Sequence, residues 1–158
     1  MKKIFKKVAF CRRLARSGAS VNGHIRIVAP DNLEFGDKIH IGTGAFIDAR
    51  GGVSIGRGVI FANNVRVISY NHDFRDRIML PYNPGLVKEP VMIEEGCWLG
   101  ESVLVAPGAK IGRGVVLGMG ALATGEIESH KLAVGVPARV IRDLPKSNEL
   151  YRLSLIHI

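Results

Sequence analysis

Aliphatic side chains recur every six residues along much of this chain. From residue 93 onward the recurring positions are Ile93, Leu99, Val105, Ile111, Leu117 and Ala123. Four residues after each comes a second small or aliphatic side chain, at Cys97, Val103, Ala109, Val115, Ala121 and Ile127. Alternate side chains of a strand face the same way. A six-residue unit with two inward positions therefore predicts a short strand followed by a turn.

An earlier array keeps the same period with one interruption. Its first inward positions are Ala29, Phe35, Ile41 and Ile47, partnered by Leu33, Ile39, Ala45 and Gly51. A two-residue slip then restarts the count at Ile55, Phe61 and Val67, partnered by Val59, Val65 and Asn71. We expect the slip to be a small bulge at a corner of the fold.

The residues at the turns indicate how the units are joined. The position before the second inward residue is often Gly or Asn, at Asn32, Gly44, Gly58, Asn64, Gly96, Gly108, Gly114 and Gly120. These residue types tolerate the positive φ that a tight corner needs. Three units close a triangular coil of 18 residues, and successive coils stack in parallel. A helix would lose about 1 kcal/mol at each interior glycine, so we predict an all-β parallel β-helix.

One segment, residues 70–90, abandons the period and carries three prolines. Such a long excursion from a compact coil is usually functional or disordered. We therefore divide the chain into an N-terminal helix (1–18), a β-helix domain (19–144, with the loop 70–90) and a C-terminal tail (145–158).

The formal charge of +8 is concentrated in the N-terminal segment. Residues 1–16 contain seven basic residues and no acid, which leaves 15 basic and 14 acidic residues elsewhere. A nucleic-acid-binding protein needs a basic stripe on its folded face, so we expect no nucleic-acid partner. Ile4, Val8, Cys11 and Ala15 follow helical spacing. Two interpretations stay open: a helix packed on the body, or an amphipathic helix on an anionic membrane.

The cysteine content argues against a disulfide framework. Cys11 and Cys97 are the only two cysteines, and no Cys/His spacing is typical of zinc. We expect a protein of the reducing cytoplasm, or of the inner face of the membrane if its basic helix binds lipid.

The repeat, the excursion and three further segments together resemble the hexapeptide-repeat acetyltransferases, in the maltose, galactoside and exopolysaccharide O-acetyltransferase branch. The segments are Ser69-Tyr70-Asn71-His72-Asp73-Phe74, Gly96-Cys97-Trp98-Leu99-Gly100, and Leu132-Ala133-Val134-Gly135-Val136-Pro137-Ala138-Arg139-Val140-Ile141-Arg142. The resemblance implies a left-handed β-helix and a homotrimer with active sites between subunits. It also implies acetyl-CoA as acyl donor and a sugar or glycan as acceptor.

Acyl transfer to a hydroxyl needs a general base whose pKa lies near the working pH, and histidine has such a pKa. Of five histidines only His72 lies where the repeat gives way to the excursion, and it matches the family's catalytic position. On residue type alone, a surface histidine without a role is the alternative. Asn71 and Asp73 are candidates to orient the imidazole or bind the sugar. Trp98 matches a family tryptophan near the reacting centre, and a packing role at the subunit interface is its alternative.

The resemblance also assigns residues to the donor. Gly118, Met119, Gly120, Ala121 and Thr124 match the family's edge along the pantetheine arm. Arg139 and Arg142 match its basic residues at the CoA phosphates, because arginine fits phosphate oxygens well. Where the family commonly has lysine after the threonine, this chain has Gly125, so Lys131 is a candidate substitute. No metal is expected.

Three rival functions are kept. The first is transfer to an amino sugar, since the same base serves either nucleophile. The second is a metal enzyme that resembles the gamma carbonic anhydrases, although the paired histidines of those enzymes are missing here. The third is a scaffold or membrane-docking trimer without activity.

Overall fold

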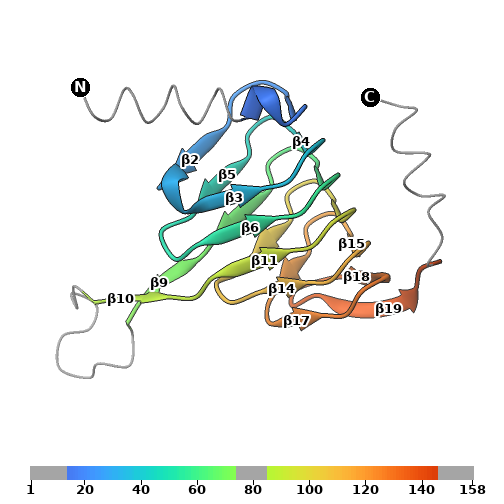
Figure 1. Cartoon of the computed structure of the whole chain (residues 1–158). Coiled ribbons are helices and arrows are strands. Elements are labelled where there is room, and N and C mark those ends of the chain that lie inside the picture. The colour runs from blue at the N-terminus through green and yellow to red at the C-terminus, as the bar shows by residue number, and fades with distance from the viewer. Residues whose placement is uncertain (1–13, 74–84, 146–158) are drawn as a thin grey trace, which may run out of the picture.

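A computed structural model describes residues 14–73 and 85–145 of the chain. Within these ranges the chain forms coils that stack along one axis, each adding a short strand to each of three parallel sheets (Figure 1). Sheet A ends in an antiparallel pair and comprises β1 (Ser20–Val21), β4 (His40–Ile41), β7 (Ile60–Phe61), β12 (Trp98–Leu99), β15 (Val116–Leu117), β18 (Lys131–Val134) and β19 (Arg139–Asp143). Sheet B comprises β2 (Arg26–Val28), β5 (Phe46–Asp48), β8 (Arg66–Ile68), β13 (Leu104–Val105) and β16 (Leu122–Ala123). Sheet C comprises β3 (Leu33–Phe35), β6 (Val53–Ile55), β11 (Val91–Ile93), β14 (Lys110–Ile111) and β17 (Glu126–Ile127).

The core confirms the repeat in the later coils. Every inward position predicted between residues 93 and 127 is buried, with at most 6% of its surface exposed. Leu99 pairs with Leu117, which lies 18 residues later. Each fully buried aliphatic side chain contributes about 1.5–3 kcal/mol relative to an exposed one. The fold is a left-handed parallel β-helix, an exception to the right-handed crossover rule.

The predicted corners are confirmed at all but one position. Positive φ angles occur at Gly44, Gly58, Asn64, Gly96, Gly108, Gly114 and Gly120. Glycine is required at position 44 for two reasons. Its φ is 75°, and a Cβ there would collide with the Asn64 side chain. Asn32 is the exception, since it ends the 3-10 turn η1 (Pro30–Asn32).

The register of the early coils differs from the prediction. Ile47 pairs with Ile27, so Ile27 rather than Ala29 occupies the inward position of sheet B. Ala29 lies in the corner with a φ of 54°. The predicted slip is confirmed as a wide turn at residues 49–52, closed by a hydrogen bond from the Gly52 amide to the Ala49 carbonyl. A second insertion at residues 29–32 is absent from the prediction, because Ile27 and Ala29 are both apolar and either fits the period.

The excursion begins as an antiparallel hairpin of β9 (Tyr70–His72) and β10 (Leu86–Lys88), which projects from the stack (Figure 1). Asn71, predicted to point inward, is exposed on this hairpin, and Gly51 is only half-buried. The hairpin and both insertions lie at the same corner, where sheet B passes into sheet C. We call this corner, made of residues 29–32, 49–52, 69–73 and 85–90, the wide corner.

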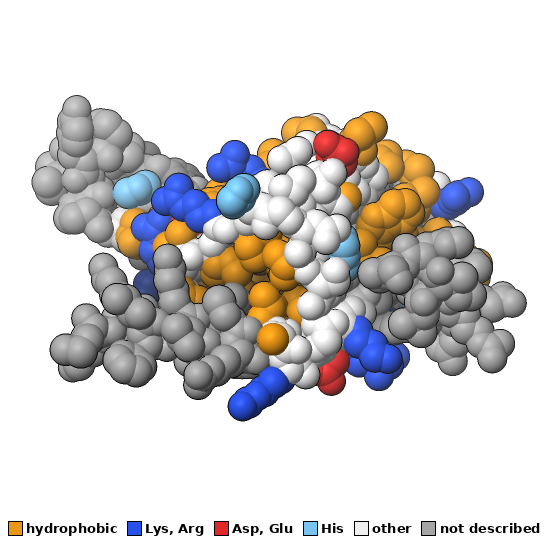
Figure 2. Space-filling model, turned by 90° about the horizontal axis from the view of Figure 1, so that it is seen from above, with side chains coloured by type: hydrophobic (Ala, Val, Ile, Leu, Met, Phe, Trp, Pro, Cys, Tyr) orange, Lys and Arg blue, Asp and Glu red, His pale blue; other side chains and the backbone are white. Residues whose placement is uncertain are grey.

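The two ends of the stack differ. At the C-terminal end, β18 and β19 form an antiparallel pair with a bulge between Leu132 and Ala133. At the N-terminal end, residues 14–16 are helical and Leu14 packs against the core. Figure 2 looks onto this end and shows hydrophobic side chains surrounded by backbone, with basic side chains at the margin. Residues 17 and 18, predicted to be helical, form a turn, while residues 1–13 and nearly all of the C-terminal tail lie outside the described residues. In the described ranges, no helix has the length and hydropathy needed to cross a bilayer.

Candidate active site at the wide corner

His72 is the last residue of β9 and is exposed. It pairs with Leu86 across the hairpin, and the next amide, that of Asp73, donates to the Gly85 carbonyl at 3.1 Å. Its imidazole lies edge-on to the Tyr70 ring, with the ring centroids 6.4 Å apart. The fold therefore presents this histidine on a projecting ribbon, where a bound molecule can reach it.

The neighbours proposed to assist His72 have different positions. The Asn71 side chain accepts a hydrogen bond from the backbone amide of His72 at 2.9 Å, so it shapes the strand end rather than contacting the imidazole. Asp73 is half-buried beyond the strand. Trp98 is 53% exposed and lies on β12 in sheet A, away from the wide corner between sheets B and C. A single chain therefore does not bring Trp98 and His72 to the same corner.

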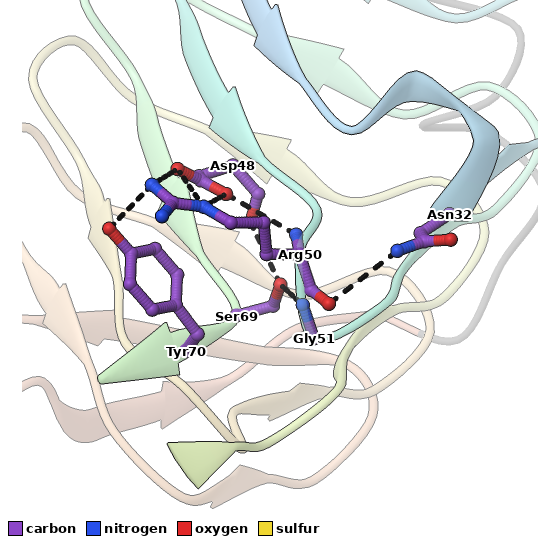
Figure 3. A network of polar contacts seen from close by, with 6 residues as sticks. All are labelled: Asn32, Asp48, Arg50, Gly51, Ser69 and Tyr70. Carbon is purple, nitrogen blue, oxygen red and sulfur yellow. Dashed lines mark hydrogen bonds and ion pairs between the residues drawn. The ribbon is translucent and has the colours of Figure 1, made fainter. Parts of the chain in front are cut away.

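A polar network, shown in Figure 3, lies under the hairpin. The Arg50 side chain donates three hydrogen bonds to Asp48, from Nε to Oδ1 at 3.0 Å, from Nε to Oδ2 at 3.2 Å and from Nη2 to Oδ2 at 2.7 Å. Arg50 Nη2 also donates to the Tyr70 hydroxyl at 2.6 Å, and its guanidinium lies 3.8 Å from the centroid of the Tyr70 ring. Hydrogen bonding to the Asp48 carboxylate raises the pKa of Arg50 above its ordinary value. The Arg50 guanidinium therefore stays protonated.

The residues predicted for the donor form two groups. Gly118, Met119, Gly120 and Ala121 form the corner between β15 and β16, next to the β18–β19 pair. Gly120 has a φ of 69° with open space around it, Met119 is 78% exposed, and the Ala121 side chain is buried in the core. The amides of Gly118, Gly120 and Ala121 already donate to protein carbonyls, so a ligand here must use the remaining backbone groups.

The second group lies across sheet B from the first. Thr124 follows β16 and is exposed at the corner between sheets B and C, two coils beyond the hairpin. The outer face of sheet B thus extends from the Gly118–Ala121 corner to the corner between sheets B and C, the column of turns from which the His72 hairpin projects. Leu104, 40% exposed, gives that face an apolar surface.

The basic candidates lie on the final strand pair. Arg139 and Arg142 are both exposed on β19, and Arg139 donates to the neighbouring Ala138 carbonyl. Lys131 instead forms ion pairs with Asp143 at 2.6 Å and Glu128 at 3.6 Å. Its hydrogen bond to Asp143 raises its pKa. Arg139 and Arg142 are therefore better placed than Lys131 to meet an anionic ligand.

The described residues do not suggest a metal centre. In residues 14–73 and 85–145, no three His, Cys, Asp or Glu side chains lie close enough together to hold an ion. Cys97 is a free, buried thiol, and burial raises its pKa to about 12.

Comparison with known proteins shows the family to which the chain belongs. A family model described as the hexapeptide repeat of succinyl-transferase matches residues 90–123. The galactoside O-acetyltransferase of Escherichia coli is 30% identical over 139 residues, covering 84% of this chain and 68% of that protein. The chain belongs to the hexapeptide-repeat acetyltransferases. A second galactoside O-acetyltransferase, from Lactococcus lactis, is 33% identical over 77% of this chain and 61% of its own length.

Solved structures show how this hexapeptide-repeat acetyltransferase chain compares in shape. A maltose O-acetyltransferase from Clostridium difficile has a TM-score of 0.64 and 29% identity, covering 81% of this chain and 67% of that one. A Vibrio cholerae hexapeptide-repeat acetyltransferase, crystallised with acetyl coenzyme A, has a TM-score of 0.74 and 20% identity, covering 86% and 78%, which supports the fold alone. The chain spans 37%, 62% and 59% of the length of three further relatives.

The network at the wide corner is absent from the sequence-based prediction. Asp48 and Arg50 fall within the slip in the count, and Ser69 enters only as part of a motif. A signal was present, since an acid immediately follows the core residue Ile47 and a base follows two residues later. A buried acid beside a basic residue predicts an ion pair.

Proposed function

We propose that this chain transfers an acetyl group from acetyl-CoA to a hydroxyl of a sugar or polysaccharide precursor, with His72 as general base. The observation that carries the proposal is the position of His72, exposed on the hairpin that leaves the β-helix, in a chain of this family. Its galactoside and maltose O-acetyltransferase relatives act on sugar hydroxyls by name.

In the proposed reaction His72 accepts one proton and later returns it. The neutral imidazole takes the proton of the acceptor hydroxyl as the oxygen attacks the thioester carbonyl. The tetrahedral intermediate then collapses, the carbon–sulfur bond breaks, and the imidazolium returns its proton to the CoA sulfur. The products are an acetyl ester and free CoA, with no change of oxidation state.

The donor is proposed to lie across the C-terminal part of sheet B. Exposed Arg139 and Arg142 offer guanidinium groups for the CoA phosphates. The turn from Gly118 to Ala121 and the apolar face at Leu104 suit the pantetheine arm, which then points toward the column of His72. We expect a homotrimer, in which a neighbouring chain brings its own Trp98 to this corner.

Calorimetric titration with acetyl-CoA tests the donor without knowledge of the acceptor. We expect saturable binding, one site per chain, weakened about 10-fold or more in an Arg139→Ala/Arg142→Ala variant, because each charge-assisted phosphate contact contributes about 1.5–3 kcal/mol. Arg57→Ala, in an exposed turn between β6 and β7, is the matched control and should bind normally. Absence of binding at millimolar acetyl-CoA would reject the proposal.

The acceptor is tested by thiol release from acetyl-CoA with a panel of methyl galactoside, maltose and their amino-sugar analogues. Acetylation of hydroxyls supports the proposal, and the site of the ester is read by mass spectrometry. Acetylation of amines alone would replace O-transfer by N-transfer. Bound zinc in the purified protein, together with carbon dioxide hydration, would favour the carbonic anhydrase alternative instead.

A further inference from the structure

The wide corner holds a buried charge that the proposed chemistry does not use. Asp48 is only 1% exposed at the end of β5. Asp48 and Ser69 are the two buried polar residues of the described part of the chain, and both lie here. Burying a carboxylate is costly unless it is paired and hydrogen-bonded. The regular corners of the later coils form without any such group, so folding the repeat does not require one.

The buried carboxylate connects to the hairpin through Arg50. Three hydrogen bonds hold the guanidinium on Asp48, and a fourth, at 2.6 Å, joins it to the Tyr70 hydroxyl. The guanidinium also stacks on the Tyr70 ring, which lies edge-on to the imidazole of His72. Figure 3 shows the carboxylate, guanidinium and phenol in line. A continuous series of contacts thus runs from the core to His72.

Ser69 forms a second connection at the base of the hairpin. Its hydroxyl donates to the Asp48 carbonyl at 2.8 Å and accepts from the Gly51 amide at 2.9 Å. Its backbone amide donates to the same Asp48 carbonyl, and its carbonyl accepts from the Glu89 amide. The strand that leads to His72 is therefore fixed to the wide turn of the preceding coil at its first residue.

A projecting hairpin needs such support. In the described residues β9 and β10 pair only with each other, at three positions, and a two-stranded ribbon alone is marginally stable. Acyl transfer requires the base to be held close to its productive position. The hairpin carries His72 away from the stack of coils, and the network holds the hairpin in a fixed position.

We propose that Asp48, Arg50 and Tyr70 are positioning residues that fix the β9–β10 hairpin and the orientation of the His72 imidazole. This inference rests on the proposed function, since it assigns the network a purpose in that reaction. It predicts that the network acts through His72 and not through the stability of the coils. Because the Asp48 side chain is only 2% exposed, a variant that left its charge unpaired would also lose stability, so the test must use variants that keep the pair or remove the buried charge.

Conservative variants separate positioning from stability. Tyr70→Phe removes the hydroxyl and keeps the ring, Arg50→Lys keeps the charge, and Asp48→Asn keeps the shape. Arg26→Lys is the matched control, because Arg26 also lies over a ring, that of Phe46, but on β2, outside the network and at the N-terminal end of sheet B. The measurements are hydrogen exchange of the amides of β9 and β10, the melting temperature, and the kinetics with acetyl-CoA and methyl galactoside.

We expect the three network variants to exchange the hairpin amides about tenfold faster, with melting temperatures close to the wild type. Their kcat should fall about 10- to 100-fold, as expected for a misplaced base, with KM for acetyl-CoA unchanged. Arg26→Lys should change neither hairpin exchange nor kcat. In a His72→Ala background Tyr70→Phe should have no further effect on the residual rate, because residues that act as a unit are not additive.

Two results overturn the inference by itself. One is unchanged hairpin exchange in all three variants, which is measured without any acceptor. The other is a loss of rate in Tyr70→Phe that is equally large when His72 is already alanine, which would indicate a general structural role. Wild-type turnover in His72→Ala alone would instead reject the proposed base, and this inference with it.

Discussion

The later coils and the wide corner are built from the same six-residue repeat but differ in its regularity and in the side chains that they bury. Between residues 93 and 127 the six-residue unit runs without insertion, inward positions are apolar, and corners are tight. At the wide corner two coils carry two extra residues each and a third releases a hairpin. Both buried polar residues of the described chain lie there, together with His72. The comparison shows that the buried polar side chains and the candidate base both lie where the six-residue period is broken.

Core truncation in the regular coils should give the largest change in stability. Leu117 is fully buried, so Leu117→Ala should lower the free energy of unfolding by about 2–5 kcal/mol through lost burial and a residual cavity. Leu104→Ala, at an outward position of sheet B, is the matched control and should change it by less than about 1 kcal/mol. Urea unfolding measures both. Equal effects would contradict the inward and outward assignment.

A methyl group at the wide corner should disturb the hairpin as well as stability. A Cβ at Gly51 would collide with the backbone carbonyl of Ser69, so Gly51→Ala must displace the start of the hairpin. We expect a loss of about 1–3 kcal/mol, as for other overpacked sites, with faster exchange of the β9–β10 amides and lower turnover. An unchanged hairpin in this variant would show that the corner does not control it.

The matched glycine lies at the regular corner of the same column. Gly125 has a φ of 73°, and a Cβ added there would meet no other atom within 4 Å. Gly125→Ala should therefore lower stability only by the cost of a left-handed alanine, about 1–2 kcal/mol. Hairpin exchange should stay at its wild-type rate. Faster exchange there would mean that the two kinds of corner are coupled.

The smallest expected effect concerns the thiol of the regular coils. Burial raises the pKa of Cys97 to about 12, so at about pH 8 the folded protein should react with a thiol reagent only as fast as it opens. A Cys11→Ser variant isolates this thiol, and urea should restore a normal rate. Because the folded pKa is raised, this group stabilises the fold below about pH 9 and loses that contribution as the pH rises toward 12.

The regular part of the fold was predictable because the side-chain polarity and the turn residues both follow the six-residue period. Apolar residues at inward positions and glycines at positive φ both repeat every six residues, and the structure places them as expected. The insertion at residues 29–32 was not predictable, because Ile27 and Ala29 are both apolar and either could be the inward residue of the repeat. Counting alone cannot locate two extra residues when the side chains on both sides are apolar.

The candidate site was predictable only in part, for a related reason. His72 could be found because it stands where the period ends. The network of Asp48, Arg50 and Tyr70 is assembled from two coils about twenty residues apart, and stacking rather than sequence proximity brings it together. The pairing of Lys131 with Asp143 likewise depends on the antiparallel return of β19.

The central claim is that the broken corner carries the chemistry while the regular coils support it. The most direct test is turnover of acetyl-CoA and a sugar acceptor by His72→Ala, measured beside its melting temperature, with His24→Ala as the exposed histidine control. The account predicts a loss of about 10²–10⁴-fold in kcat with an unchanged melting temperature, and a normal rate for the control. Near wild-type turnover in His72→Ala would contradict it.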